Sequence, residues 1–260
     1  MVNYHLMIGV QSSDKNSEPV NKISFVGKTM MKLLSCLVLF GLLSVGCSTN
    51  DSDENDDFGN YGEGNPDNII QFKDWVAEDI CVKLWDTNGD RKFSYREAAA
   101  VKSIGLNFHN SDIQSLGELH WFTGLTSIPD FAFEGCHSLT LIAIPENVTS
   151  IGECAFAGCS RLTMMDIPDS ITSIGESAFS NCRSLKWILI PSSVTSIGYC
   201  AFDDCSFEHV YCKPATPPIV SGPLFTHCYP IIYVPIASVD AYRNSWSYWQ
   251  NYIVGYDFND

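Results

Sequence analysis

The chain has few basic residues and no long apolar run. Its 260 residues include 15 Lys and Arg against 30 Asp and Glu, which gives a formal net charge of −15. A surface with this charge repels phosphate backbones, so we expect no nucleic-acid partner. The apolar run at residues 33–45 is shorter than the roughly 20 residues that a membrane-spanning helix needs. It therefore predicts no transmembrane helix.

The sequence also lacks the short motifs that mark common enzyme classes. It contains no Gly-x-Ser-x-Gly elbow, no His-Glu-x-x-His zinc motif, no phosphate-binding glycine loop and no paired histidines or cysteines at metal-ligand spacing. The histidines after residue 46 stand apart from one another: His109, His120, His137, His209 and His227. We predict that the chain is not an enzyme. The alternative is a general-base role for His209 beside a carboxylate distant in sequence.

The dominant positive feature is a unit that returns every 23 residues. It is marked by Phe133, Phe156, Phe179 and Phe202, each followed three places later by a cysteine. Each unit continues with Leu-x-x-Ile/Met-x-Ile-Pro, as in residues 139–145, 162–168 and 185–191. One unit is far too small to bury its own apolar face, so neighbouring units must stack around a continuous core. The period therefore predicts a solenoid.

Comparison between the units separates core positions from surface positions. The inward positions stay apolar: Leu139, Ile142, Ile144, Leu162, Met165, Ile167, Leu185, Ile188, Ile190, Phe207, Val210 and Cys212. Alternation along a strand points the third and fifth residues of each unit outward. These variable columns contain Leu141, Met164, Trp187 and His209, and Ala143, Asp166, Leu189 and Tyr211.

The outward columns are the predicted contact site. Aromatic residues and methionine are enriched at contact hot spots, and an open apolar patch favours a partner. We predict ligand binding by Leu141, Met164, Asp166, Trp187, Leu189, His209 and Tyr211, with Trp187 and Tyr211 as the first choices. The alternative is that these side chains cover one another or face the C-terminal tail.

The 11 cysteines do not predict a disulfide framework. Cys136, Cys159, Cys182 and Cys205 occupy equivalent positions, so we expect a ladder of free buried thiols. Cys212 and Cys228 lie outside the regular units and are the better disulfide candidates. Gly152, Gly175 and Gly198 are expected to supply a corner. Stacked hydroxyls at Thr149, Thr172, Thr195, Ser150, Ser173 and Ser196 are expected to satisfy backbone groups in the turns, with a polar binding face as the alternative.

The regular period ends after Pro214. Val239, Tyr242, Trp246, Trp249 and Ile253 then recur at spacings of three and four, which predicts one apolar helical stripe. Because a solenoid must cover its last open rung, we interpret residues 238–252 as a terminal cap. An aromatic platform that stacks carbohydrate is the alternative.

An acidic loop precedes the repeats. Residues 71–85 carry Phe72, Trp75, Val76, Ile80 and Leu84 on one predicted helical face. The next segment resembles an EF-hand calcium loop, with oxygen donors at Asp86, Asn88, Asp90, Lys92 and Glu97. Arg91 stands where the pattern has glycine, which strains the turn. Calcium is the cofactor that this resemblance implies. The alternative is a plain helix-loop-helix corner in which Ser94 and Glu97 form a capping box.

The N-terminal region resembles the signal of a bacterial lipoprotein. Lys32 and the apolar run 33–45 are followed by Gly46 and Cys47, and the resemblance implies cleavage before Cys47 and its lipidation. An ordinary secretory signal is the alternative. Residues 1–29 precede this signal, and we interpret them as the result of a start codon assigned in error upstream of the true one. The acidic run at residues 51–57 looks like a signal for the outer cell surface of Gram-negative bacteria, or else is a solvated linker.

The units from Leu162 to Cys182 and from Leu185 to Cys205 resemble BspA-like leucine-rich repeats, through their Ile-Pro, Thr-Ser-Ile-Gly and Ala-Phe phrases. The resemblance covers residues 71–253 and implies a right-handed, β-rich leucine-rich-repeat solenoid with short strands, a small N-terminal helix-loop-helix and a C-terminal helical cap. We expect an upstream segment and signal peptide at 1–46, a tether at 47–68, the EF-hand-like module at 69–104, the repeats at 105–214 and the cap at 215–260.

The resemblance also implies a role. Such proteins are surface lipoproteins linked to adhesion, so we expect a non-catalytic binding protein on the outer membrane of a Gram-negative bacterium. Its lipid anchor would be at Cys47 and its partner a host or extracellular-matrix protein. A glycan-capturing accessory lipoprotein and an envelope scaffold without a host ligand are the alternatives.

Overall fold

The computed structural model describes residues 67–259, which all lie within one compact unit of the chain. Cys47, the signal-like run and residues 47–66 of the expected tether lie outside the described residues. No helix within residues 67–259 is long and apolar enough to cross a membrane. The described part begins just before the EF-hand-like module and extends through the repeats and the expected cap.

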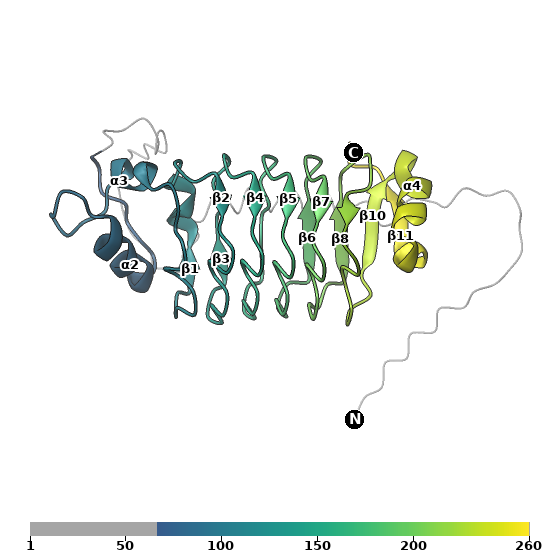
Figure 1. Ribbon diagram of the computed structural model, residues 1–260, viewed down its shortest axis with the longest axis horizontal. Coiled ribbons are helices and arrows are strands. Elements are labelled where there is room, and N and C mark those ends of the chain that lie inside the picture. The colour runs from purple at the N-terminus through teal and green to yellow at the C-terminus, as the bar shows by residue number, and fades with distance from the viewer. Residues whose placement is uncertain (1–66, 260) are drawn as a thin grey trace, which may run out of the picture. The chain divides into compact units, whose positions relative to one another are not determined.

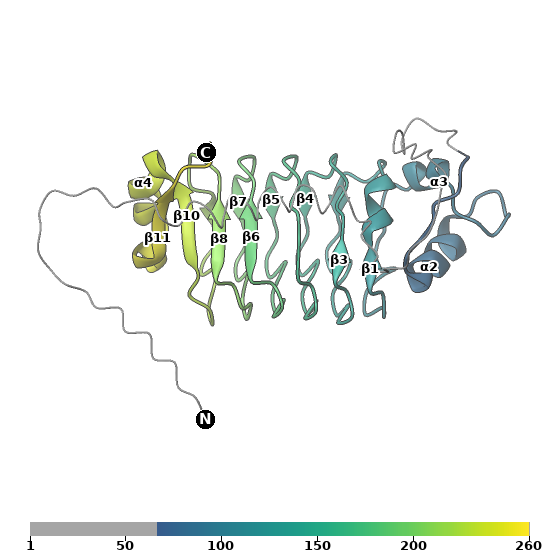
Figure 2. The same ribbon diagram turned by 180° about the vertical axis from the view of Figure 1, so that it is seen from behind.

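The repeats form coils joined by parallel strands. One five-stranded sheet has the order β2-β4-β5-β7-β9. Its strands are β2 (Ser127–Ile128), β4 (Ser150–Ile151), β5 (Ser173–Ile174), β7 (Ser196–Ile197) and β9 (Ile219–Val220). Ser150 pairs with Ser173 and Ser173 with Ser196, so each coil places equivalent residues side by side. Figures 1 and 2 show these strands in a row, with α2 and α3 at one end and α4 at the other.

The strands on the other side of the last coils form a separate four-stranded sheet in the order β11-β10-β8-β6. Its strands are β6 (Trp187–Ile190), β8 (His209–Cys212), β10 (Ile231–Pro235) and β11 (Ile253–Tyr256). Nearer the N-terminal end, β1 (Ser115–Leu116) pairs with β3 (Leu141–Ile142). All these pairings are parallel, as expected for stacked coils.

The inward positions expected from the repeat are confirmed as core positions, since each is at most 5% exposed. Phe133, Phe156 and Phe179 are fully buried and stacked. Their ring centroids are 5.2 Å and 5.4 Å apart, and their planes are 3° and 7° from parallel. Phe202 continues the stack at 5.7 Å. Such aromatic pairs contribute about 0.5–1.5 kcal/mol beyond burial, so the ladder holds each coil against the next.

Glycine is needed at the three equivalent positions for a different physical reason than the corner that the sequence predicts. Gly152, Gly175 and Gly198 do not have positive φ angles. A Cβ built on Gly175 would lie 2.5 Å from the carbonyl carbon of Gly152, and one on Gly198 would lie 2.4 Å from the amide nitrogen of Glu176. Glycine is needed because the backbone of the preceding coil passes too close for a side chain. Positive φ angles occur instead at the equivalent residues Phe131, Cys154, Ser177 and Cys200.

The thiol ladder is confirmed, and so is the hydrogen-bonding role of the three threonine hydroxyls. The thiols of Cys136, Cys159, Cys182 and Cys205 are free, and each donates to the carbonyl oxygen of a phenylalanine 26 or 28 residues earlier. Thr149, Thr172 and Thr195 each donate their hydroxyl to the preceding threonine carbonyl at 3.1 Å. Cys212 and Cys228, the better disulfide candidates, do not form a disulfide. Both thiols are free, and Cys212 Sγ lies 3.3 Å from the Tyr242 hydroxyl.

The N-terminal module contains α2 (Trp75–Trp85), α3 (Tyr95–Ala100) and the short 3-10 helix η1 (Gly117–Trp121). The helical face expected over residues 71–85 is confirmed only in part, since Phe72, Val76 and Ile80 pack against the core. Trp75 is 75% exposed and Leu84 is 48% exposed. The helix buries Ala77 and Cys81 instead. Asp74 sets this orientation, because its carboxylate caps α2 and also accepts the backbone N–H groups of Gln114 and Ser115.

The segment expected to form the C-terminal cap contains short helices and not one continuous helix. It consists of η2 (Ile236–Ser238), α4 (Val239–Ser245) and η3 (Ser247–Tyr252). The α-helix ends at Trp246, whose φ of −106° and ψ of 50° are not helical. Tyr242, Trp246 and Trp249 are nevertheless buried, so the stripe covers the last coil as expected.

Candidate functional site

Strand alternation and register bring the predicted contact residues of the last coils together. In β6 and β8 the buried and half-buried residues alternate, which points Trp187, Leu189, His209 and Tyr211 outward. Trp187 lies opposite His209, and Leu189 lies opposite Tyr211. Strand β10 extends both columns, by pairing Ile231 with His209 and Tyr233 with Tyr211. The term aromatic strand face denotes Trp187, Leu189, His209, Tyr211, Ile231, Tyr233, Val254 and Tyr256.

The centre of the aromatic strand face is a cluster of interlocked rings. Tyr211 and Tyr233 stack with centroids 4.8 Å apart and planes 11° from parallel. The edge of Tyr256 meets both rings, at 5.7 Å from Tyr211 and 5.6 Å from Tyr233. Burial raises the pKa of Tyr211 to about 12, so its hydroxyl stays neutral at physiological pH. The expectation that these rings cover one another is therefore confirmed for Tyr211, and the contacts fix the rings in one arrangement.

The margins of this face are more open than its centre. Trp187, Leu189 and His209 are half-buried, whereas Ile231 is 41% and Val254 is 45% exposed. His209 contacts the cluster through Tyr233, whose hydroxyl lies 3.4 Å from Nδ1. Within residues 67–259 the histidine–carboxylate pairs are His109 with Glu134 and His227 with Asp203 and Asp204. The general-base alternative for His209 therefore has no carboxylate partner in this part of the chain.

The predicted site did not include Ile231, Tyr233, Val254 and Tyr256. A sequence signal was present for β10, because residues 231–235 repeat the alternation and final proline of residues 187–191. No equivalent signal marks β11, which follows the cap and returns beside β10.

The first three predicted contact residues lie outside this face. Leu141 is in β3, which pairs with β1 and belongs to a different sheet. Met164 and Asp166 lie on a leg of their coil that forms no strand, where Asp166 makes only an isolated bridge to Ala143. Burial, with a further contribution from Asp169, raises the pKa of Asp166, while Lys213 opposes the shift. The aromatic strand face therefore has a carboxylate just beyond its β6 boundary.

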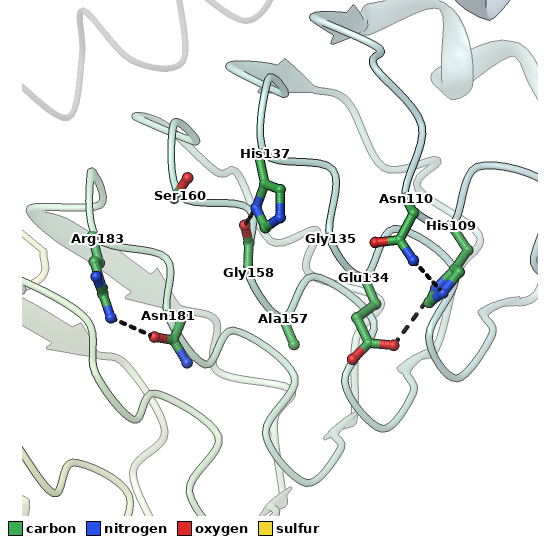
Figure 3. Close-up of a pocket in the computed structure, with 10 residues that line it drawn as sticks. All are labelled: His109, Asn110, Glu134, Gly135, His137, Ala157, Gly158, Ser160, Asn181 and Arg183. Carbon is green, nitrogen blue, oxygen red and sulfur yellow. Dashed lines mark hydrogen bonds and ion pairs between the residues drawn. The ribbon is translucent and has the colours of Figure 1, made fainter.

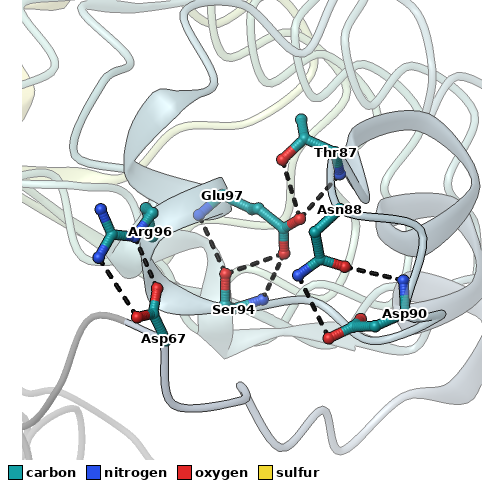
Figure 4. Close-up of polar contacts among 7 residues, drawn as sticks. All are labelled: Asp67, Thr87, Asn88, Asp90, Ser94, Arg96 and Glu97. Atoms are coloured by element: carbon teal, nitrogen blue, oxygen red, sulfur yellow. Dashed lines mark hydrogen bonds and ion pairs between the residues drawn. The ribbon is translucent and has the colours of Figure 1, made fainter.

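The acidic loop shows the expected strain and the expected capping box. Arg91 has a φ of 63°, in the left-handed region that glycine favours. The carboxylate of Asp86 accepts the backbone N–H groups of Gly89 and Arg91, and Asn88 and Asp90 accept those of Asp90 and Lys92. Ser94 and Glu97 form the capping box of α3. Figure 4 shows Glu97 facing Ser94 and Thr87, while the side chains of Asn88 and Asp90 contact each other.

Glu97 decides how well this loop fits calcium. One of its carboxylate oxygens accepts Thr87 N and Oγ1 at 2.7 and 3.0 Å, and the other accepts Ser94 N and Oγ at 2.9 Å each. Each oxygen thus already accepts two hydrogen bonds, so a bidentate bond to calcium requires the capping box to open. Asp86, Asn88 and Asp90 fit a calcium loop, whereas Glu97 in this arrangement does not. The calcium site stays a prediction.

The loop also has a pairing partner from its own chain. Ile69 and Ser94 form an antiparallel bridge, with Ile70 N donating to Phe93 O at 2.8 Å and Tyr95 N donating to Asn68 O at 3.1 Å. Residues 68–70 therefore pair with the backbone around Phe93 at the C-terminal side of the acidic loop.

A different group of side chains is the best candidate metal centre within residues 67–259. One ligand atom each from Asp203, Asp204 and His227 lies within 4.8 Å of the others. His227 Nδ1 is 3.0 Å from Asp204 and 3.4 Å from Asp203, and the guanidinium of Arg183 is 3.8 Å from Asp204. Since His227 is 69% exposed and Arg183 already supplies a cation, the arrangement also describes a surface ion-pair cluster.

Comparisons with known proteins agree with the repeat. Residues 102–232 match the family described as BspA type leucine rich repeat region, in six copies. A crystal structure of a T. pallidum leucine rich repeat protein is 31% identical over 37% of this chain and 50% of that chain, with a TM-score of 0.30. One from Bacteroides ovatus is 23% identical over 43% of this chain and 37% of that chain, also at 0.30. The chain thus spans half the length of these proteins or less. No curated protein matches it.

Proposed function

The chain belongs to the BspA-type leucine-rich-repeat family, and we propose that it is a non-catalytic binding protein that docks a protein partner on its aromatic strand face. Repeats of this type commonly mediate protein binding or adhesion. A host or extracellular-matrix protein is the partner we favour. Its contacting patch would be apolar with a basic rim, since the chain carries a net charge of −15.

The observation that carries this proposal is the packing of Tyr211, Tyr233 and Tyr256 on a face that also holds the half-buried Trp187, opposite His209. Tyrosine and tryptophan rings offer a large contact area at a small cost in side-chain entropy. Rings already held by their neighbours lose still less freedom when a partner binds. The margins formed by Ile231 and Val254 add apolar area that is open to solvent.

We further propose that the protein is held at the outer membrane by a lipid on Cys47, and that it faces the surface of a Gram-negative bacterium. The sequence around Cys47 and the acidic run after it support this part of the proposal. Cys47→Ala should abolish metabolic labelling with palmitate and release the protein from the membrane fraction. Unchanged labelling would contradict the anchor. Resistance of the wild type to protease on intact cells would favour the envelope-scaffold alternative.

The docking site is tested by binding of the purified chain to immobilised collagen, fibronectin, laminin and mucin. Trp187→Ala is expected to weaken the bound complex by about 2 kcal/mol, or roughly thirtyfold, as for a contact hot spot. Trp75→Ala is the matched control, because Trp75 is 75% exposed on α2 at the other end of the coils. Absence of binding to all four proteins, or equal losses in both variants, would refute the proposed site.

A further inference from the structure

A polar groove lies along the turns that connect the two sheets. It has a volume of about 660 Å³ and crosses successive coils from His109 and Glu134 at one end to Asn181 and Arg183 at the other. Figure 3 shows His137 and Ser160 beside this groove, with Gly135, Ala157 and Gly158 between its ends. Its residues belong to the turns and not to the aromatic strand face, so it is a separate surface of the protein.

The groove is hollow at its centre because Gly158 and Ala157 have little or no side chain there, while Asn110 covers Gly135. Along the groove a second position of each turn has a left-handed backbone, with φ angles of 52° at Asn110, 72° at Gly135, 77° at Gly158 and 61° at Asn181. The two outer coils place an asparagine there, whereas the two inner coils place glycine. Ala157 is likewise the smallest residue in the column whose other members are Glu134, Ser180 and Asp203. The hollow is therefore bounded by an amide at each end.

The charged groups of the groove already have partners within the protein. His109 Nδ1 is 3.5 Å from the Glu134 carboxylate, and Arg183 is 3.8 Å from Asp204. Arg183 also donates to Asn181 Oδ1 at 3.0 Å. Glu134 and Arg183, the formally charged groups at the two ends of the groove, thus each have a polar partner, which favours an uncharged ligand over an anion or a cation.

The remaining polar groups offer both donors and acceptors. His137 Nδ1 is 2.8 Å from Gly158 O, a distance at which the ring N–H donates to the carbonyl and leaves Nε2 as an acceptor. Ser160 Oγ, one coil further on, is both a donor and an acceptor, and the free guanidinium N–H groups of Arg183 are donors. These groups recur at the spacing of neighbouring coils, roughly 4.8 Å, which is close to the length of one pyranose unit.

We propose that this groove binds a neutral oligosaccharide of about three sugar units. A sugar hydroxyl both donates and accepts a hydrogen bond, which matches the mixed set offered by His137, Ser160 and Arg183. A linear glycan lying across the coils meets one such set per unit. Gly158 and Ala157 leave room for the rings, whereas the Asn110 side chain occupies the space beside Gly135 and, with Asn181, limits the length that the groove holds.

The test fills the hollow without changing the backbone. Gly158→Asn introduces the residue that the next coil has at the equivalent position, and asparagine tolerates the left-handed conformation. A Cβ at Gly158 would meet its nearest neighbour, His137 Cε1, at an ordinary 3.5 Å. The variant is therefore expected to keep the melting temperature of the wild type within a few degrees while its side chain occupies the groove.

Calorimetry on the purified full chain, with maltotriose, cellotriose, xylotriose, laminaritriose and chitotriose as probes, supplies the readout. We expect at least one trisaccharide to bind, with affinity at least tenfold weaker in Gly158→Asn. Arg183→Ala, which alters an exposed side chain, should weaken the same ligand about fivefold. Trp187→Ala should leave the affinity unchanged, so that failure of the aromatic strand face and failure of the groove are told apart. Absence of binding by all five sugars, wild-type affinity in Gly158→Asn, or loss of affinity in Trp187→Ala would each overturn the proposal.

Discussion

A single methyl group at Gly175 should reveal how tightly the coils are stacked. A Cβ at this position would lie 2.5 Å from the carbonyl carbon of Gly152 and 2.6 Å from Glu153 N, closer than the 3.0 Å below which real Cβ atoms are essentially never found. Both neighbours are backbone atoms. The amide of Gly175 also donates to Ile151 O at 2.8 Å, so the coils cannot separate without losing a ladder hydrogen bond.

The expected magnitude follows from two opposing effects. Overpacking of a rigid site costs about 1–3 kcal/mol. Replacing glycine by alanine also restricts the unfolded chain, which stabilises the folded state by about 0.4–1 kcal/mol. We therefore expect Gly175→Ala to lower the free energy of unfolding by about 1–2 kcal/mol. For a domain of this size the melting temperature falls by about 2–4 °C per kcal/mol, or roughly 2–8 °C in total.

Gly117→Ala is the matched control, because a Cβ there would have nothing within 4 Å and Gly117 has no positive φ. It should be neutral or slightly stabilising. Urea unfolding followed by circular dichroism gives the free energy of both variants, and a thermal scan gives the melting temperatures. If Gly175→Ala proves as stable as Gly117→Ala, close backbone contact is not the reason for glycine at this position.

Two further predictions concern the thiol ladder and the acidic loop. Burial raises the pKa of Cys205 to about 12 and that of Cys182 well above the ordinary 9.0, so these thiols lose their protons at a lower pH in the unfolded chain than in the folded one. The urea midpoint should therefore be constant below about pH 9 and fall as the pH rises toward 12, with a shallower fall in Cys182→Ala. A midpoint that does not change with pH would contradict free buried thiols. Glu97→Ala removes the capping box and should lower the free energy of unfolding by about 1–2 kcal/mol, equally in chelator and in millimolar calcium. Glu78→Ala, which alters an exposed side chain, is the control. A loss of stability seen only in calcium would instead identify Glu97 as a metal ligand.

The repeat made most of the core predictable because equivalent residues perform the same task in every coil. The period alone places Phe156 between Phe133 and Phe179, and it aligns the thiols in one direction. The inward columns could be read in the same way, since apolar character persists where the core requires it. The sequence could not show that Gly175 is needed for close contact, because a turn and a close contact both select glycine.

The ends of the coils were less predictable because periodicity does not operate there. Trp75 and Leu84 fit an apolar helical stripe, but the hydrogen bonds that the Asp74 carboxylate accepts from Gln114 N and Ser115 N hold α2 so that Ala77 and Cys81 face the core. The same limit applies to the aromatic strand face. Tyr256 reaches Tyr211 only because the chain returns beside β10 after the cap, a long-range pairing that no local pattern encodes.

The two proposed surfaces are built independently, and one shortened turn shows why. Cys182 and Cys205 occupy equivalent positions, since each thiol donates to the phenylalanine carbonyl 26 residues earlier. From there to the strand the later coil is one residue shorter, yet Trp187 still lies opposite His209 and Leu189 opposite Tyr211. The turn absorbs the missing residue while the strand register is kept. Side chains in the turns can therefore vary without moving the aromatic strand face, so one stack of coils can carry a protein contact on its strands and a separate ligand on its turns.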